Sequence, residues 1–387
     1  MKVLLLLVSA GWIGYVYFGY PALLWILSRV WRRRPVMKED FVPTVSVLIS
    51  ARNEEKDIEW KIRETLQWDY PPERLQVLVA SDASDDGTDE ILQGIRHRSF
   101  GFVRINERGG KNTALNRLAR IATGDLLFFT DANSHIASDC LRQMVRYFAD
   151  SRVGCVTGAE ENPSDRDGHA VTSGIKAFHG YEHWVKSLES NLGSVLVCDG
   201  AIFCIRRSLF SDVEPDLAND LELPLQIGRA GYWVLCEPGA RSLEVSTESA
   251  REEFARRRRI SGQGFLGMWR LRKCLSGLRG LQFLSRKLLR WLTLIPVAMI
   301  LIASLISWHQ PFFAMLLLLQ GAFYLLAIAG WVLNAAGRST SRVVSLPFYF
   351  MLSNVAAMCG VVEACMGRRF QVWDIASLSR GRSDATV

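Results

Sequence analysis

The stretch TVSVLIS at residues 44–50 is followed at once by the charged turn ARNEE at 51–55. A short run of β-branched and apolar residues predicts a buried strand, and the charged turn predicts the end of that strand. The same pattern recurs, with further strands expected at 75–81, 102–107 and 125–130 and helices at 53–68, 87–96 and 112–122. This alternation predicts an α/β fold with a mostly parallel sheet and helices on both faces.

Ligands of such sheets bind at the carboxyl ends of the strands, so the residues just after each strand are the first candidates for a site. The second strand is followed by SDASDDGT at 81–88, and the fourth ends in TDANS at 130–134. Acidic turns in these places are also common helix N-caps, a role that fits Asp86 or Thr88. Three such clusters at one sheet edge, with Gly109-Gly110-Lys111 between them, predict a shared binding site.

These residue types suit a nucleotide-activated sugar, whose base must be read and whose diphosphate must be neutralised. Asp82 can accept a hydrogen bond from the N3–H of a pyrimidine. Asp131 and Asn133 offer hard oxygen ligands for magnesium or manganese, which keep waters and phosphate oxygens as their other ligands. Such a metal offsets the charge on a departing nucleoside diphosphate, and Lys111 adds a cation near the phosphates.

Both ends of the chain are apolar. The run Val3–Ser28 has no charged residue, and four arginines follow at 29 and 32–34. It is long enough to cross a bilayer as a helix and too long for a cleaved signal peptide, the alternative reading. The arginines predict that the following domain is cytoplasmic. Three more uncharged runs, at 292–308, 312–336 and 343–362, predict membrane helices near the C-terminus.

The side of the membrane that holds the C-terminus stays open. Three spans after a cytoplasmic domain would place it outside, yet arginines at 368, 369, 380 and 382 favour the inside. The last apolar run contains Pro347 and Asn354, so it is either a span or a re-entrant or interfacial segment. Asn354 is expected as a helix-packing residue or as a lipid contact. Interface anchoring is expected of three tryptophans, Trp291, Trp308 and Trp331.

The net charge of +7 is concentrated, because eleven basic residues and no acidic one lie between Phe254 and Arg290. Apolar residues alternate with these cations, which predicts a basic amphipathic segment on the anionic inner leaflet and argues against a nucleic-acid site. The eight cysteines show no CxxC pair and no metal-ligand spacing. We therefore expect reduced, buried thiols.

Six motifs in this order resemble the family 2 inverting glycosyltransferases: ARNEE (51–55), SDASDDGT (81–88), GGKNTALN (109–116), FFTDANS (128–134), CDGAIFCIRR (198–207) and NDLELPLQI (219–227). That family includes hyaluronan, chitin-oligosaccharide, poly-N-acetylglucosamine and cellulose synthases. The resemblance covers Val42 to Gly264. It implies a GT-A domain, which is a Rossmann-like nucleotide-diphospho-sugar transferase fold, together with transmembrane α-helices.

The resemblance also implies roles for the donor-site residues. Ala51, Arg52 and Glu54 would contact the base and ribose, and Asp82 would read uracil. Asp131 matches the first aspartate of the DxD metal motif. Asn133 stands at the second position of that motif, where its amide is a weaker and neutral ligand for the Mg or Mn cofactor.

On the acceptor side, Asp220 matches the general base, which would take the proton from the acceptor hydroxyl as that oxygen attacks C1 and inverts the anomeric centre. The alternative for Asp220 is a helix N-cap, and Glu222 is the reserve base. Asp199 and Gly200 match the stretch that lines the acceptor site, where a glycine lets a sugar approach the backbone. A helical stretch is expected before Asp199. Three of its residues either face the acceptor or pack in the core or at an interface: His179, His183 and Trp184.

One departure concerns the QxxRW motif that follows the base in processive members. Here the aligned stretch is RRRRI at 256–260. Arg259 keeps the arginine and is expected to bind the diphosphate in charge-assisted hydrogen bonds. Ile260 replaces the tryptophan, so an aromatic platform for the acceptor sugar is missing. This favours transfer of one sugar or a few onto a lipid-linked or membrane-associated glycan.

The predicted domains are a transmembrane helix at 1–30, a cytoplasmic GT-A domain at 42–255, a basic interfacial region at 256–290, transmembrane helices at 291–366 and a basic tail at 367–387. We predict a multi-pass enzyme of the bacterial inner membrane for envelope or exopolysaccharide assembly. Its partners would be a nucleotide sugar, membrane lipids and polysaccharide-assembly proteins, with no nucleic acid. A processive synthase that exports its product is one alternative, and an inactive subunit of an export complex is another.

Overall fold

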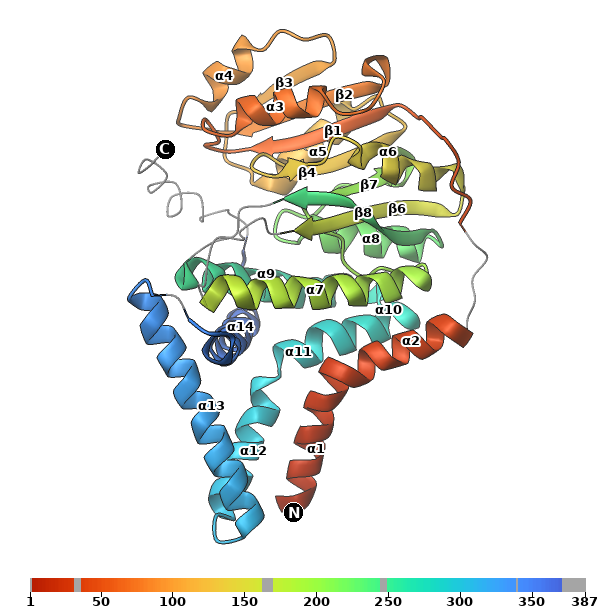
Figure 1. The fold of residues 1–387 in the computed structure, drawn as a ribbon. Helices are drawn as coiled ribbons and strands as arrows, with labels where there is room; N and C mark the ends of the chain where they lie inside the picture. The colour runs from red at the N-terminus through yellow and green to blue at the C-terminus, as the bar shows by residue number, and fades with distance from the viewer. Residues whose placement is uncertain (1, 31–35, 162–169, 244–248, 339, 371–387) are drawn as a thin grey trace.

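The computed structural model describes residues 2–30, 36–161, 170–243, 249–338 and 340–370, except the side chains of 161 and 170–179. An eight-stranded sheet forms its centre, with the strand order β3-β2-β1-β4-β7-β6-β8-β5 (Figure 1). The strands are β1 (Val45–Ala51), β2 (Leu75–Asp82), β3 (Phe100–Ile105), β4 (Leu126–Asp131), β5 (His135–Ile136), β6 (Val153–Glu161), β7 (Phe203–Arg206) and β8 (Trp233–Leu243).

The first four strands are parallel, as the alternation of strands and helices predicts. The second half of the sheet is mixed, because β7 runs antiparallel to both β4 and β6, and β5 runs antiparallel to β8. Ala51 pairs with Ser81, and Ser50 pairs with Asp131. The three polar clusters therefore follow strand ends at one edge of the sheet, which confirms the prediction of a shared edge.

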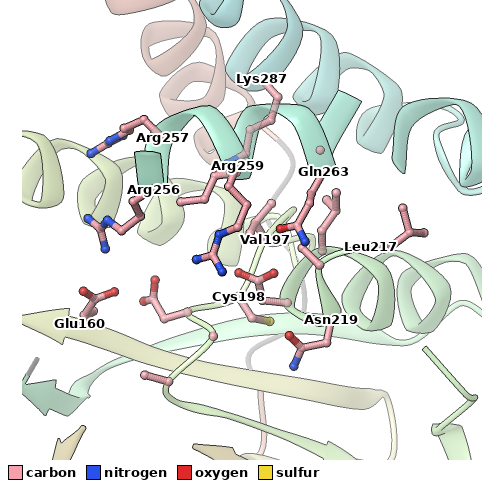
Figure 2. A pocket seen from close by; sticks show the side chains of 18 of the residues that line it. Glu160, Val197, Cys198, Leu217, Asn219, Arg256, Arg257, Arg259, Gln263 and Lys287 are labelled. Atoms are coloured by element: carbon pink, nitrogen blue, oxygen red, sulfur yellow. The ribbon is translucent and has the colours of Figure 1, made fainter. Parts of the chain in front are cut away.

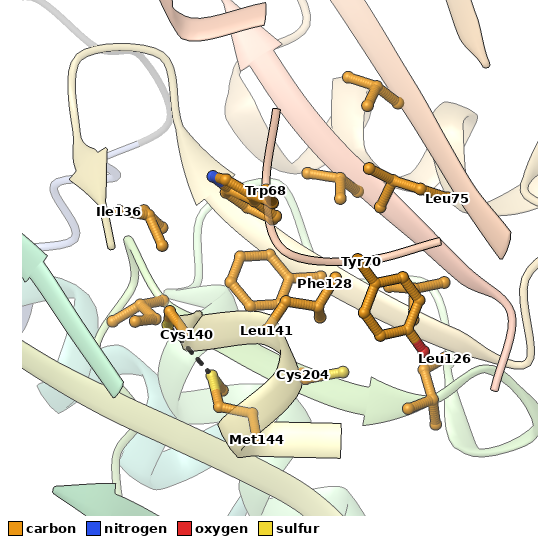
Figure 3. Close-up of a cluster of buried hydrophobic side chains, with 14 of the residues drawn as sticks. Trp68, Tyr70, Leu75, Leu126, Phe128, Ile136, Cys140, Leu141, Met144 and Cys204 are labelled. Atoms are coloured by element: carbon orange, nitrogen blue, oxygen red, sulfur yellow. Dashed lines mark hydrogen bonds between the residues drawn. The ribbon is translucent and has the colours of Figure 1, made fainter. Parts of the chain in front are cut away.

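Two apolar cores flank the sheet, because successive side chains of a strand point to opposite faces. Val47 and Ile49 face the first core, and Leu48 faces the second. Figure 3 shows the first core around Phe128, whose ring meets Trp68 edge to face at 5.3 Å between centroids. The covering helices are α3 (Ile58–Leu66), α4 (Thr88–Gly94), α5 (Lys111–Ile121), α6 (Cys140–Val145), α7 (Ala170–Asn191) and α8 (Asn219–Arg229).

The helix expected at 53–68 begins only at Ile58. Asn53 adopts the left-handed conformation at a φ of 54°, and the carbonyl of Glu54 accepts the backbone N–H groups of Asp57 and Ile58. Residues 53–57 therefore form a turn at the carboxyl end of β1. Non-glycine residues in this conformation are uncommon and cluster at functional sites.

The remaining helices lie below the sheet in Figure 1: α1 (Lys2–Gly14), the π-turn η1 (Tyr15–Gly19), α2 (Tyr20–Val30), α9 (Ala250–Arg270), α10 (Leu278–Phe283), the π-turn η6 (Leu284–Leu288), α11 (Leu289–Trp291), α12 (Leu294–Ile306), α13 (Pro311–Ala335) and α14 (Arg342–Cys365). Within the described ranges, three helices are long and apolar enough to cross a membrane. They are Lys2–Val30, Pro311–Ala335 and Arg342–Cys365, and a pair bent by 52°, Leu278–Trp291 with Leu294–Ile306, is a fourth candidate.

Helix α14 differs from the other membrane candidates in direction. It is seen nearly end-on in Figure 1, whereas α1, α12 and α13 are seen lengthwise. It packs against α9 and α7 beneath the sheet domain. Helix α14 therefore lies across the other membrane candidates, and the choice between a span and a re-entrant or interfacial segment stays a prediction.

Gly360 brings α14 into direct contact with the backbone of α9. A Cβ at this position would overlap with the carbonyl oxygen of Arg258 and with the hydroxyl of Ser261. We expect Gly360→Leu to push the helices apart and to cost about 1–3 kcal/mol of stability. A lower midpoint of thermal unfolding in detergent measures this loss.

The matched control is Gly321→Leu on α13, where a Cβ would meet no atom within 4 Å. Its unfolding midpoint should equal that of the unmodified protein. Equal midpoints for both variants would show that the contact between α9 and α14 is not tight.

The cysteines match the expectation of buried thiols at six of eight positions. Cys359 is half-buried and Cys365 is exposed, and no cysteine forms a disulfide. Burial raises the pKa of the Cys236 thiol to about 12. The Cys236 thiol is therefore protonated and unreactive near neutral pH.

The basic segment 256–290 makes many internal ion pairs. Arg257 pairs with Glu253, and Arg286 pairs with Glu182 and Glu189. Further pairs join Arg256 to Glu253, Arg258 to Glu363, Arg270 to Asp216 and Arg290 to Glu182. The pairs of Arg256 and Arg257 with Glu253 lie within α9. Arg258, Arg270, Arg286 and Arg290 instead pair with residues of other segments, a role that the sequence did not suggest because those partners lie far along the chain.

Candidate active site

A pocket of about 350 Å³ lies between the carboxyl edge of the sheet and helix α9. Figure 2 shows its walls, which come from β6, from the loop before β7, from the start of α8 and from α9. Six residues that the sequence predicted for the site line it: Lys111, Asp131, Asp199, Gly200, Asp220 and Arg259. The structure thus brings together side chains that are far apart in the sequence.

Asp131 ends β4 and forms an ion pair with Lys111, the first residue of α5. Both side chains are partly buried in the pocket wall. Gly110 directly precedes Lys111 and adopts a φ of +84°, a conformation that favours glycine. The glycine turn therefore aims the ammonium group at the carboxylate, which places a cation in the pocket beside Asp131.

Asp82 contacts the glycine turn that precedes Lys111. Its buried carboxylate accepts the backbone N–H groups of Gly109 and Gly110, each at 2.8 Å. It therefore holds the turn that positions Lys111, a role that the sequence did not predict. Each carboxylate oxygen has a further lone pair, and the reading of uracil by Asp82 stays a prediction.

The other predicted donor-site residues surround the ends of β1 and β2. Ala51 is buried at the end of β1. Arg52 donates hydrogen bonds to the carbonyl oxygens of Asp82 and Ala83, at 2.9 and 3.0 Å. The buried Glu54 donates its backbone N–H to the hydroxyl of Thr88. The side chain of Arg52 and the backbone of Glu54 are therefore bonded to the end of β2 and to Thr88, and the nucleotide contacts of both residues remain predictions.

Asp220 lies in the first turn of α8 and faces the pocket. Among the residues that the structure describes, its carboxylate has no hydrogen-bond or ion-pair partner. Burial raises the pKa of Asp220, and the positive charges of Lys111, Lys287 and Lys186 oppose that rise. A carboxylate with a raised pKa and a free face is suited to accept a proton.

Glu222, the reserve base, does not line this pocket. Its carboxylate accepts the backbone N–H of Glu214 at 3.0 Å and the side-chain amide of Gln226 at 2.9 Å. Burial raises its pKa to about 7. Because both oxygens are occupied by local partners, Glu222 is a packing residue of α8.

The predicted acceptor loop runs beside Asp220. The backbone N–H of Cys198 donates to the carbonyl oxygen of Asp220 at 2.9 Å. A Cβ on Gly200 would stand 3.6 Å from the Asp220 carboxylate, so the glycine backbone faces this carboxylate directly. Asp199 forms an ion pair with the buried Lys186 of α7, a pocket residue that no motif indicated.

His179, His183 and Trp184 were expected either to face the acceptor or to pack, and their positions relative to the pocket differ. His183 lines the pocket. The side chain of Trp184 is 48% exposed and does not line it. The side chain of His179 lies outside the described residues.

Helix α9 closes the pocket with the arginine-rich stretch. Figure 2 shows Arg259 extending from α9 into the pocket. Ile260 and Gln263 line the same wall. The domain boundary predicted at 255/256 falls inside α9, so this helix links the sheet domain to the basic segment.

Aromatic side chains from elements outside the six sequence motifs also line the pocket. Trp291 packs over Gly264, where a Cβ would stand 2.5 Å from the indole ring. Its role as an interface anchor was a wrong prediction, since it is 8% exposed and meets Phe283 edge to face. Phe370 also lines the pocket, and its carbonyl accepts a hydrogen bond from Gln263 at 3.0 Å.

The residues present fit a divalent metal only in combination with a diphosphate. Asp131 supplies one carboxylate in the pocket, and Asn133 lies exposed on the turn that follows. The described residues hold no group of three or more His, Cys, Asp or Glu side chains that could bind a metal. Magnesium and manganese often take one or two carboxylates with phosphate oxygens and waters, which matches this small donor set.

The comparisons with known proteins agree with this geometry. The model of the family described as Glycosyltransferase like family 2 matches residues 43–262. A beta-monoglucosyldiacylglycerol synthase of Trichormus variabilis is 26% identical over 195 residues, which is 48% of this chain and 41% of that protein. A poly-beta-1,6-N-acetyl-D-glucosamine synthase of Staphylococcus aureus is 25% identical over 239 residues, 59% of this chain and 56% of its own length. The matches thus span about half the length of these relatives.

Among solved structures, a mannosyltransferase of Pyrobaculum calidifontis in complex with GDP-Man and Mn²⁺ has a TM-score of 0.71 and 21% identity. The likeness covers 94% of this chain and all of that one, and it shows a shared fold.

The sheet, the acidic carboxyl edge and the pocket define a glycosyltransferase with a GT-A fold and helices able to cross a membrane. The family model matches residues 43–262, which is more than half of the chain. The protein therefore belongs to glycosyltransferase-like family 2. Its relatives include synthases of polysaccharides and of glycolipids.

Proposed function

We propose that this protein transfers a sugar from a UDP-sugar to a hydroxyl of a membrane-associated or lipid-linked acceptor, with inversion at C1, in cell-envelope or exopolysaccharide assembly. The observation that carries this proposal is the shared pocket. It joins the Asp131–Lys111 ion pair, which suits a diphosphate, to the unpartnered carboxylate of Asp220.

In the proposed reaction Asp220 takes the proton from the acceptor hydroxyl. The acceptor oxygen forms a bond to C1, and the electron pair of the bond that C1 shared with the diphosphate leaves on that diphosphate. Lys111 and Arg259 supply positive charge for the leaving group. A divalent metal bound at Asp131 would neutralise further charge on the phosphates.

We further propose that the catalytic pocket and residue 370 face the cytoplasm. Phe370 lines the pocket, so the chain after α14 lies on the same side as the sheet domain. With α14 lying across the other helices, the bent pair Leu278–Trp291 with Leu294–Ile306 would lead out through the membrane and α13 would lead back. This arrangement supports a cytoplasmic tail and matches the preference of its arginines for that side.

Nucleotide release tests the proposed function. The protein in detergent is incubated with a lipid extract and a panel of UDP-sugars, with GDP-mannose as a further donor, with and without manganese. We expect UDP release from one donor, stimulated by manganese. No release from any donor would overturn the proposal.

The raised pKa of Asp220 predicts the acid side of the pH profile. A general base works only when deprotonated, so kcat/KM should fall as the pH falls through the pKa of this carboxyl. Since burial raises that pKa, the fall should occur above the ordinary aspartate value of about 3.9. Initial rates across pH measure it, and return to neutral pH separates protonation from unfolding. A fall at the ordinary value would contradict the burial argument.

A further inference from the structure

A second cavity of about 660 Å³ adjoins the catalytic pocket on the side of the membrane helices. Side chains from η1, α7, α9, α13 and α14 line it. Six residues belong to the walls of both spaces: Glu182, Arg257, Ile260, Arg286, Lys287 and Trp291. The catalytic pocket and this tail cavity are therefore neighbours separated by shared side chains.

The far walls of the tail cavity are apolar, with Phe323 on α13 and Leu346 and Phe350 on α14. Its volume lies within the range of small-molecule sites, roughly 300–1,000 Å³. Asn354, expected as a packing residue or a lipid contact, lines the cavity and donates its amide to the carbonyl of Phe350 at 2.8 Å. An apolar space of this size favours a hydrocarbon occupant over water.

The shared wall is basic, and its cations differ in their partners. Arg257 pairs with Glu253, and Arg286 pairs with Glu182. Lys287 has no hydrogen bond or ion pair with any residue in the described part of the chain. Figure 2 shows Lys287 reaching into the pocket beside Arg259.

An unpaired cation between two cavities indicates where an anion would bind. Removing a charge from water without a partner is unfavourable, and a phosphoryl group would supply charge-assisted hydrogen bonds. The charge of Lys287 also reaches Asp220, since it opposes the rise in the pKa of that carboxyl. Lys287 and Asp220 also line the same pocket, so a ligand held at Lys287 would share that pocket with the proposed base.

Building on the proposed function, we propose that the acceptor is a phosphoryl-bearing lipid, with its hydrocarbon tail in the tail cavity, its phosphoryl group at Lys287 and its nucleophilic hydroxyl at Asp220. In the transfer, the hydroxyl proton goes to Asp220, the acceptor oxygen bonds to C1 of the donor sugar, and the nucleoside diphosphate leaves with the electron pair. Both a phosphatidylglycerol and an isoprenoid diphosphate that carries a sugar have this combination of groups.

Lipid binding tests the proposal without any donor. The full-length protein in detergent is incubated with phosphatidylglycerol, with diacylglycerol of the same acyl chains, or with a farnesyl diphosphate-linked N-acetylglucosamine, and bound lipid is quantified by native mass spectrometry. We expect Lys287→Gln to weaken binding of both phosphoryl lipids by about tenfold and to leave diacylglycerol binding unchanged. Ser353→Phe, which adds a ring inside the tail cavity, should weaken binding of all three.

Two matched variants control for general damage. Lys273→Gln removes an exposed lysine outside both cavities, and Leu325→Phe adds a ring on the outward face of α13, where Leu325 is 68% exposed. Both should bind all three lipids as the unmodified protein does. Diacylglycerol bound as tightly as phosphatidylglycerol, or an unaffected Lys287→Gln, would overturn the phosphoryl site. Unaffected binding by Ser353→Phe would overturn the tail site.

Together with the nucleotide-release assay, and with analysis of the lipids for added sugar, the binding experiment also separates the acceptor proposal from the proposed function. If the lipids bind as expected but no nucleotide sugar yields nucleotide release, the function fails and the lipid site stands. If release occurs but neither phosphoryl lipid gains a sugar, the acceptor proposal fails and the transferase stands. The lipid that gains the sugar distinguishes the phospholipid source from the isoprenoid source.

Discussion

Asp220→Asn should lower kcat for sugar transfer by about 10²–10⁴-fold, the usual contribution of a general base. The substitution keeps the size of the side chain and removes the group that takes the acceptor proton. The carboxylate has no protein partner among the described residues, so its loss leaves no protein group unpaired. Initial rates of nucleotide release measure kcat, and calorimetric titration with UDP should show unchanged donor binding.

Glu222→Gln is the matched control on the same helix. Glu222 does not line the pocket, so its loss should change kcat only slightly, although stability can fall because two hydrogen bonds are altered. A rate for Asp220→Asn equal to that of the unmodified protein would remove Asp220 from the role of base. A large loss for Glu222→Gln alone would assign that role to Glu222.

Asp131→Asn should lower kcat/KM by about 10²-fold or more, because charge stabilisation of the leaving group contributes several kcal/mol in such sites. Asp131 both holds Lys111 and offers the carboxylate for a metal. The variant should therefore also need more manganese for half-maximal nucleotide release. Rates at a series of manganese concentrations measure both effects, and calorimetry with manganese and UDP gives a readout independent of turnover.

The control for this variant is Asp139→Asn, a charge removal at the exposed position before α6, where among the described residues the carboxylate accepts a hydrogen bond only from Gln143. It should leave the manganese dependence unchanged. If Asp131→Asn retains the full rate and the same manganese requirement, the leaving group is stabilised by cationic side chains alone.

The parallel half of the sheet could be predicted from the sequence because its signals are local. A buried strand, a polar turn and an amphipathic helix repeat along residues 44–130, and each repeat places polar residues at one edge. This is why Asp131 and Lys111 were found. The antiparallel strands β5 and β7 are short, with two and four residues, and their pairing is set by partners far along the chain.

The rest of the pocket depends on tertiary packing. Lys186 and Lys287 reach the site from helices whose sequences look like ordinary basic or interfacial segments. Trp291 was misassigned because a buried aromatic residue and an interface anchor look alike beside an apolar run. Phe370 follows α14, a helix that is long and apolar enough to cross a membrane. Its position in the wall of the catalytic pocket is set by the tertiary fold and has no local signal in the sequence.

The distribution of the cysteines gives this protein a built-in probe of membrane sidedness. Six thiols are sealed inside the sheet domain and its adjoining helices, and the two that are not, Cys359 and Cys365, both lie on α14. A maleimide that cannot cross a bilayer is therefore expected to reach sulfur only on this helix, with the exposed Cys365 at its C-terminal end. Labelling of intact and of permeabilised cells can locate the catalytic face without first building a cysteine-free variant.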